Sequence, residues 1–192
     1  MKRPVWLFAA AVLAALLQIG FLAWMINARA AILRDGREVL LKVQPVDPRD
    51  LLRGDYVRLG YNISALPKTL LETGPDEAEL ARDATVWLRV RRGEDGIFAP
   101  VSLRLRAEAP ALAEEEADIR GRVRSGWQEI TGTILVDYGI ERFYLPEGEG
   151  RAIEADMRER SFFMIVAVGD DGQAQIKAFL DGDQRLYEEP LY

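Results

Sequence analysis

The sequence predicts a mainly β (α+β) protein, in which an N-terminal transmembrane helix precedes a single β-barrel- or sandwich-like domain with a few short helices. Three observations lead to this prediction. Residues 5–26 are almost wholly apolar and carry no charge, which is the pattern of a membrane-spanning helix. Many short apolar segments follow, several with the alternation of a half-buried strand. Gly and Asp residues separate these segments, as they do at turns between antiparallel strands.

The composition limits the chemistry that the chain can perform. The 192 residues include no Cys and no His. A disulfide framework and a thiolate nucleophile are therefore excluded, and the commonest general base and transition-metal ligand are missing. The formal net charge of −6 argues against non-specific nucleic-acid binding, which depends on basic patches. We expect no cofactor, no metal ion and no nucleic-acid partner.

The N-terminal segment predicts a single-pass membrane anchor. As a helix, residues 5–26 would span about 33 Å, close to the ~30 Å hydrocarbon core of a bilayer. Trp6 and Trp24 lie near its two ends, where indole rings prefer the membrane interface. Two alternatives stay open: a cleaved signal peptide, with Ala28-Arg29-Ala30 as its small-residue pattern, and a buried core helix. The predicted organisation is a basic tail at 1–4, a transmembrane helix at 5–27, a linker or helical extension at 28–37 and a mostly β domain at 38–192.

The charges around the anchor decide its orientation only in part. Two basic residues precede the apolar run and four follow it closely, so a count of basic residues does not discriminate between the two orientations. A very short basic tail before one long apolar helix usually stays in the cytoplasm. We therefore expect a protein of the cell membrane whose C-terminal domain is extracytoplasmic.

Alternation and turn residues predict the strands of the domain. Residues 56–63 alternate most clearly, and Asp47-Pro48 ends the preceding strand because proline lacks a backbone donor. Turn sequences at 93–96 and 169–172 predict two hairpins. The predicted strands are 38–46, 56–63, 85–90, 98–105, 119–123, 129–136, 142–145, 162–168 and 174–180. Short helices are predicted at 64–71, 75–81 and 153–159, and a charged loop or helical turn at 112–118.

The segment 46–61 has two interpretations. In the first, turns at its Pro and Gly residues only lead the chain into a strand. In the second, Asp50, Asp55, Tyr56 and Tyr61 form a polar surface site, whose tyrosines bind a peptide or a sugar by stacking and hydrogen bonding. The first interpretation explains most of the segment, but it gives no role to the tyrosines or to the charges.

A second candidate site is the Gly-rich stretch 144–150. Its Glu147 and Glu149 would repel phosphate, and it lacks the Lys and Ser/Thr of a P-loop. The two carboxylates suit the N-terminus of a following helix, or a hard cation shared with Asp50 and Asp55.

Four stretches of the sequence resemble one protein family. Gly54-Asp55-Tyr56-x-x-Leu59-x-Tyr61 resembles the signature of the GDYXXLXY protein family at every fixed position, and residues 45–53 resemble the family's usual approach to it. Residues 138–150 and 186–191 are similar to the family's second characteristic stretch and to its C-terminal pattern. The resemblance implies a bacterial membrane-anchored protein, often encoded beside multi-pass membrane proteins of unknown role. It brings no established reaction, so no catalytic residue is carried over.

Three functional hypotheses follow from the sequence. The first is a non-enzymatic, membrane-anchored accessory protein whose β domain binds a membrane-protein partner or an envelope component. It is favoured because no Ser and Lys pair has the setting of an activated nucleophile and base. The second is a carboxylate-dependent, glycan-cleaving envelope enzyme that pairs Asp50 or Asp55 with Glu147 or Glu149. The third is a structural spacer. Trp87 is predicted to lie in the core rather than in a ligand site.

Overall fold

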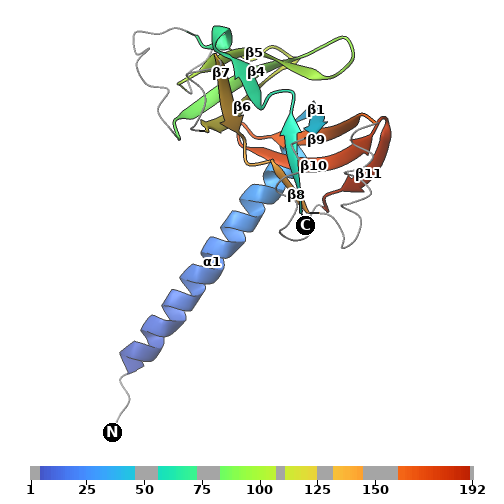
Figure 1. The fold of residues 1–192 in the computed structure, drawn as a ribbon. Helices are drawn as coiled ribbons and strands as arrows, with labels where there is room; N and C mark the ends of the chain where they lie inside the picture. The colour runs from blue at the N-terminus through green and yellow to red at the C-terminus, as the bar shows by residue number, and fades with distance from the viewer. Residues whose placement is uncertain are drawn as a thin grey trace.

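A computed structural model of the chain describes residues 5–45, 56–72, 83–106, 111–124, 132–144 and 160–190. Within these ranges, one long helix is followed by two antiparallel β-sheets (Figure 1). The strand order is β11-β10-β9-β1-β2-β8 in the six-stranded sheet and β3-β7-β6-β4-β5 in the five-stranded sheet. The elements are α1 Val5–Asp35, β1 Arg37–Pro45, β2 Tyr56–Tyr61, β3 Ala65–Pro67, the 3₁₀ turn η2 Lys68–Leu70, β4 Thr85–Arg92, β5 Phe98–Arg104, β6 Glu116–Val123, β7 Thr133–Asp137, β8 Arg142–Tyr144, β9 Phe162–Val168, β10 Ala174–Asp181 and β11 Gln184–Glu188. The predicted fold class is confirmed.

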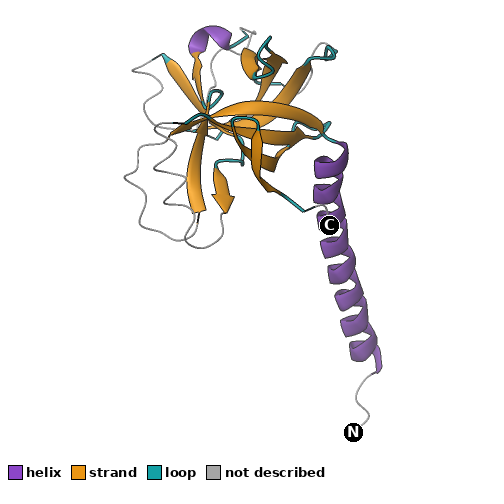
Figure 2. Cartoon of the chain, turned by 90° about the vertical axis from the view of Figure 1, so that its right-hand side faces the viewer, coloured by secondary structure: helices purple, strands orange, loops and turns teal. Residues whose placement is uncertain are grey.

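Helix α1 projects from the domain as a single rod (Figure 2). Among the described residues it is the one helix that is long and apolar enough to cross a membrane. Its side chains are exposed from Trp6 to Arg29, whereas Ala30 and Leu33 are buried. The last turns of α1 contact β9 and β10. Of the two predictions for residues 28–37, a linker or a helical extension, the extension is therefore the one that forms, as far as Asp35.

The junction between α1 and β1 is tight. The Gly36 amide donates to the Ile32 carbonyl at 2.9 Å and closes the last turn. A Cβ on Gly36 would overlap the Ile32 carbonyl oxygen and lie 3.0 Å from the Val168 carbonyl oxygen. The next residue, Arg37, already pairs with Val168 in the antiparallel β1–β9 ladder. The helix thus passes into the sheet with a single residue between them.

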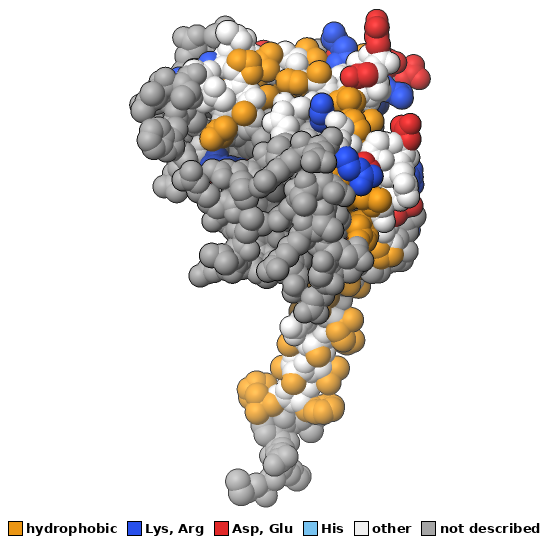
Figure 3. All heavy atoms as spheres, turned by 45° about the vertical axis from the view of Figure 1, so that its right-hand side comes forward, with side chains coloured by type: hydrophobic (Ala, Val, Ile, Leu, Met, Phe, Trp, Pro, Cys, Tyr) orange, Lys and Arg blue, Asp and Glu red, His pale blue; other side chains and the backbone are white. Residues whose placement is uncertain are grey.

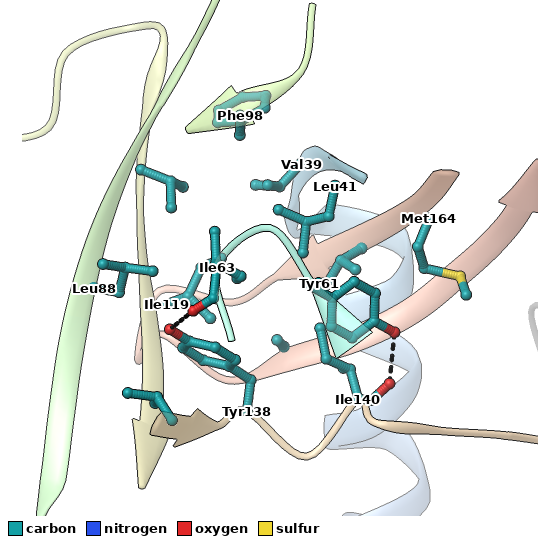
Figure 4. Packing of buried hydrophobic residues seen from close by; sticks show 14 of the residues in the cluster. Val39, Leu41, Tyr61, Ile63, Leu88, Phe98, Ile119, Tyr138, Ile140 and Met164 are labelled. Carbon is teal, nitrogen blue, oxygen red and sulfur yellow. Dashed lines mark hydrogen bonds between the residues drawn. The ribbon is translucent and has the colours of Figure 1, made fainter. Parts of the chain in front are cut away.

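The two sheets enclose one hydrophobic core (Figure 4). Strands β1 and β4 send alternate side chains into it, as the period of two requires. On β1 these are Val39, Leu41 and Val43, and on β4 they are Val86, Leu88 and Val90. The turn between β9 and β10 reaches the second sheet, because the Arg120 amide of β6 donates to the Gly172 carbonyl at 2.8 Å. The six-stranded sheet therefore touches β6 through this turn as well as through the core.

Most predicted strands form, and the two predicted hairpins, β4–β5 and β9–β10, are confirmed. Two local predictions are wrong, and one strand is missing from the prediction. Residues 64–71 were expected to form a helix, but Leu66 is fully buried and pairs with Ile134 of β7, so β3 and the short η2 form instead. Glu116 and Asp118, expected in a loop or helical turn, lie in β6. Strand β11 was not predicted.

Four other predictions concern two helices, one strand and a tryptophan. The predicted helices at 75–81 and 153–159 lie outside the described residues, as does the start of the strand predicted at 129–136. Trp87 is only half-buried and stands beside Arg104 and Arg120 on the neighbouring strands, so it is not a member of the core.

The close contacts at the α1–β1 junction predict that one added methyl group there lowers the stability of the protein. Gly36→Ala should lower the free energy of unfolding by about 1–3 kcal/mol, because neighbouring backbone must move. Gly20→Ala is the matched control: its Cβ meets nothing within 4 Å, so it should cost nothing measurable. Thermal unfolding of the full chain in detergent, followed by circular dichroism, compares them. Equal melting temperatures would show that the junction tolerates displacement.

Candidate functional site

The strand that carries the signature residues lies inside the six-stranded sheet. Strand β2 pairs with β1 on one side and with β8 on the other, and Tyr56 is opposite Tyr144. Because β2 and β8 are antiparallel, the chain enters β2 and leaves β8 at the same end of the sheet. Residues 46–55 and 145–159, which lie outside the described residues, are both attached at this end. We call it the β2–β8 end.

Two buried tyrosines brace the connections between the sheets (Figure 4). The Tyr61 hydroxyl donates to the Ile140 carbonyl at 2.6 Å, and the Tyr138 hydroxyl donates to the Ile63 carbonyl at 2.8 Å. The bonds are reciprocal: Tyr61 ends β2 and donates to the β7–β8 connection, and Tyr138 of that connection donates to the residues that follow β2. We call this arrangement the tyrosine brace. Burial, with a smaller contribution from the charge of Glu141, raises the pKa of both hydroxyls well above the ordinary value, so both are neutral donors.

Glu141 shapes the second of these connections. Its carboxylate accepts the backbone amides of Tyr138 and Gly139, which closes the turn between β7 and β8. Gly139 has φ +82°, a conformation that favours glycine. The Glu141 carbonyl accepts the Leu59 amide at 2.8 Å, so this turn is also tied to β2.

The structure describes only some of the site residues that the sequence predicts. Tyr61, expected at a polar surface, is fully buried, and its hydroxyl is consumed by the brace. This corrects its expected position: a tyrosine can lie in a core when its hydroxyl finds an acceptor. Tyr56 is placed by its backbone in β2. The four carboxylates lie outside the described residues, so their grouping stays a prediction; they are Asp50, Asp55, Glu147 and Glu149.

A second polar cluster, which the sequence analysis missed, covers the outer face of β4, β5 and β6. Arg89 and Asp118 form a bidentate pair, with Nε–Oδ1 at 3.0 Å and Nη2–Oδ2 at 2.9 Å. Arg104 from β5 places Nη2 at 2.7 Å from the same carboxylate. Arg89 is 8% exposed and Arg104 only 5%, so these charges are largely withdrawn from water. The sequence does contain a signal for this cluster. Arg89 and Arg91 alternate along one strand, and Glu116 and Asp118 alternate in the same way along another.

The cluster continues toward the six-stranded sheet. Glu116, 6% exposed, accepts from Arg91 through Nε at 3.0 Å and Nη2 at 2.6 Å. Arg37, the first residue of β1, donates to the Ala113 and Glu114 carbonyls just before β6. We call the set of Arg37, Arg89, Arg91, Arg104, Glu116 and Asp118 the arginine cluster.

The arginine cluster keeps its carboxylates ionised. Burial raises the pKa of Asp118, but the hydrogen bonds from Arg89 and the ion pair with Arg104 outweigh that effect, and the pKa lies below its ordinary value. The hydrogen bond from Arg91 lowers the pKa of Glu116. Two carboxylates that are already saturated by guanidinium groups are poor proton acceptors and poor metal ligands. In the described ranges, Asp and Glu do not gather in groups of three or more as metal ligands would.

Comparison with known proteins gives one family. The family profile described as "GDYXXLXY protein" matches residues 18–179. The chain belongs to the GDYXXLXY protein family. No curated protein and no solved structure matches it.

Within this GDYXXLXY protein, the signature has an evident structural role. Leu59 and Tyr61, two of its fixed positions, lie in the core, and Tyr56 begins β2. The family's second characteristic stretch, predicted at 138–150, begins with the other tyrosine of the brace. The two stretches therefore hold each other in place.

The brace predicts a stability cost for losing one hydroxyl. Tyr61→Phe leaves the buried Ile140 carbonyl without its donor and should lower the free energy of unfolding by about 1–3 kcal/mol. Tyr187→Phe is the control, because the Tyr187 hydroxyl makes no hydrogen bond with the described part of the chain. Chemical denaturation of the full chain measures both. A Tyr61→Phe protein as stable as the Tyr187→Phe protein would contradict the brace.

The arginine cluster predicts a dependence of stability on acid. The pKa of Asp118 is lowered in the folded state, so its stabilisation is complete above the ordinary carboxyl pKa and is lost as the pH falls from roughly 5 through the folded-state value. Asp118→Asn should lower the free energy of unfolding by about 3–5 kcal/mol at neutral pH. The buried Arg104 loses the carboxylate that lies 2.7 Å from it, and Arg89 loses its bidentate partner while keeping Glu116 at 3.6 Å. In the Asp118→Asn protein, stability should also fall less steeply as the pH is lowered than it does in the wild-type protein.

Asp171→Asn controls for the loss of a charge at the surface. Asp171 is more than half exposed and lies 3.5 Å from Arg120, so its substitution should cost at most about 1 kcal/mol. Melting temperatures between pH 3 and 8 would compare the three proteins, with those pH limits set roughly by the range in which carboxyls titrate. If the melting temperature of Asp118→Asn falls with acid as steeply as that of the wild type, other carboxyls cause the acid sensitivity.

Proposed function

We propose that this GDYXXLXY protein is a single-pass membrane protein whose β domain binds a membrane-protein partner or envelope component at the membrane surface, without catalysing a reaction. The observation that carries the proposal is the unbroken course of α1. One helix runs from the apolar stretch directly into the domain, where Ala30 and Leu33 are buried. A cleaved signal peptide would remove a helix whose end is part of the fold.

The dimensions of α1 suit a membrane anchor. Trp24 follows Trp6 by eighteen positions, and at 1.5 Å per residue this is about 27 Å, close to the hydrocarbon thickness. From Trp24 to the first buried residue, Ala30, is only about 9 Å. The headgroup layer is about 5–8 Å thick on each side. A domain on this anchor would therefore rest on the headgroups rather than extend away on a stalk.

The tight junction supports a fixed orientation of the domain. Because Gly36 alone separates α1 from β1, and because Leu33 packs into the domain, the anchor and the domain move together. Strand β8 lies on the side of the domain from which α1 emerges (Figure 1). The β2–β8 end would then face the membrane region, where a multi-pass partner presents its loops.

We assign the partner-binding surface to this β2–β8 end. The residues proposed to make contact are those that the sequence singles out beside it, namely Asp50, Asp55, Tyr56, Glu147 and Glu149. They carry carboxylates and an aromatic ring, which suit a partner with basic and hydrogen-bonding groups. We also propose that the domain is extracytoplasmic, with Lys2 and Arg3 on the cytoplasmic side of the anchor.

The proposal is tested by site-specific photo-crosslinking in living cells. A photo-crosslinking amino acid at Asp55 or Glu147 should give an adduct with a second protein, identified by mass spectrometry after purification in mild detergent. The control position is Glu94, which is exposed in the β4–β5 turn at the end of the domain away from α1 (Figure 1). Recovery of the uncrosslinked protein alone from all three positions would contradict partner binding. Release of the chain by alkaline carbonate would contradict the anchor.

A glycan-cleaving enzyme is the second candidate, and one observation favours it. The pairing of Tyr56 with Tyr144 attaches both carboxylate-bearing segments to the same end of the sheet. Catalysis by two carboxyls requires them to lie about 5–9.5 Å apart. Asp55→Asn and Glu147→Gln should each abolish cleavage of cell-wall glycan if this candidate is correct. Purified wild-type protein that cleaves no glycan would remove it.

A further inference from the structure

One face of α1 repeats with the spacing of a coiled-coil seam. Leu7, Ala11, Ala14, Gln18, Phe21 and Met25 follow one another at intervals of four and three residues. Alternate steps of three and four keep side chains on one face of a helix and mark positions a and d of a heptad. All six side chains are exposed in the described structure. Figure 3 shows the apolar side chains of α1 standing free of the domain. We call these six residues the Gln18 face.

Gln18 is the strongly polar member of this face. Within the described part of the chain, the Gln18 side chain makes no hydrogen bond. Asn27, nearer the domain, satisfies its amide by donating to the Ala23 carbonyl one turn earlier at 2.9 Å. By the helix rise, Gln18 lies about 9 Å on the membrane side of Trp24 and so within the hydrocarbon. A carboxamide there is costly unless another helix supplies hydrogen bonds.

We infer that α1 pairs with α1 of a second copy of this chain, in parallel, through the Gln18 face. This inference rests on the proposed membrane anchoring. A glutamine amide is both donor and acceptor, so two such groups related by a two-fold axis satisfy each other. In a parallel pair, identical residues meet at identical depth, and a second copy is therefore certain to present an amide where it is needed. Ala11 and Ala14 add no bulk, so the two backbones approach closely beside the paired amides.

The position of the domain permits this pairing. At about 100° per residue, Leu33 lies roughly 60° and Ala30 roughly 120° around the helix from Gln18. These two residues point at the domain, which therefore lies to one side of the Gln18 face. A two-fold axis along the seam would place the two domains on opposite sides of the helix pair. Ala9 lies about 180° from Gln18, on the face directed away from the partner.

The pairing can be tested by disulfide crosslinking, because the sequence contains no cysteine that could form other disulfides. Ala11→Cys and Ala14→Cys, each in the otherwise Cys-free full chain, should form a disulfide-linked dimer when membranes are oxidised. Ala9→Cys is the matched control, since it makes the same substitution within about 3 Å of the depth of Ala11 but on the opposite face. Crosslinking at Ala11 and Ala14 but not at Ala9 supports the inference. Equal crosslinking at all three, or at none, overturns it, and so does an adduct with a different protein.

The role of the amide is tested separately. Gln18→Leu, which keeps the helix apolar, should weaken dimerisation in detergent at least about threefold, as loss of one interhelical hydrogen bond predicts. Gln18→Asn, which keeps the carboxamide, should retain more of the dimer. Dimerisation unchanged in Gln18→Leu would overturn the role of the amide. If carbonate releases the chain from membranes, the proposed function fails; if the chain stays in membranes as a monomer, only this inference fails.

Discussion

The reciprocal hydrogen bonds of Tyr61 and Tyr138 are the constraint on which the arrangement of the two sheets depends. The chain crosses from the six-stranded to the five-stranded sheet between β2 and β3, and it returns between β7 and β8. Tyr61, the last residue of β2, donates to a carbonyl of the return crossing, and Tyr138 of the return crossing donates to a carbonyl of the first crossing. Both bonds are buried, where a hydrogen bond is electrostatically stronger and an unpaired carbonyl is costly. The two hydrogen bonds thus fix the two crossings relative to each other. They thereby also fix the distance between the two sheets, which the core side chains fill.

The arginine cluster acts on the opposite side of the five-stranded sheet. A slip of β4 by one residue against β6 would turn Arg89 into the core and Val90 toward water, because the side-chain period of a strand is two. The bidentate contact with Asp118 would be lost at the same step. Buried ion pairs are weak evidence for stability, and their better attested role is to select one register. We take register selection as the hypothesis for this cluster, and the Asp118→Asn protein addresses it directly.

The sequence predicted those features that depend on local periodicity. The apolar run, the β4–β5 and β9–β10 hairpins and the fold class all follow from residues close together in the chain. The failures share a cause, because in each a distant partner decides the structure. Ser64 offers a helix cap, yet Leu66 pairs with Ile134. Tyr61 has a hydroxyl that suggests a surface, yet its acceptor lies 79 residues away. Glu116 and Asp118 suggest a loop until their arginine partners on β4 are known. The carboxylates of the candidate site, at 50, 55, 147 and 149, lie outside the described residues, and their grouping rests on sequence alone.

The rigid junction couples the two proposed binding surfaces. Ala30 and Leu33 of α1 are buried against the domain, and Gly36, directly after the helix, lies against Val168. A rotation of the helix about its axis must therefore rotate the domain. Pairing through the Gln18 face would therefore fix not only the distance between two domains but also the direction in which each β2–β8 end points. A partner that contacts both ends would meet a preformed pair of surfaces and would lose less rotational freedom on binding than it would with two independent domains. A flexible linker at residues 28–37 would remove this coupling, whereas in the structure the helix continues to Asp35 and β1 begins at Arg37.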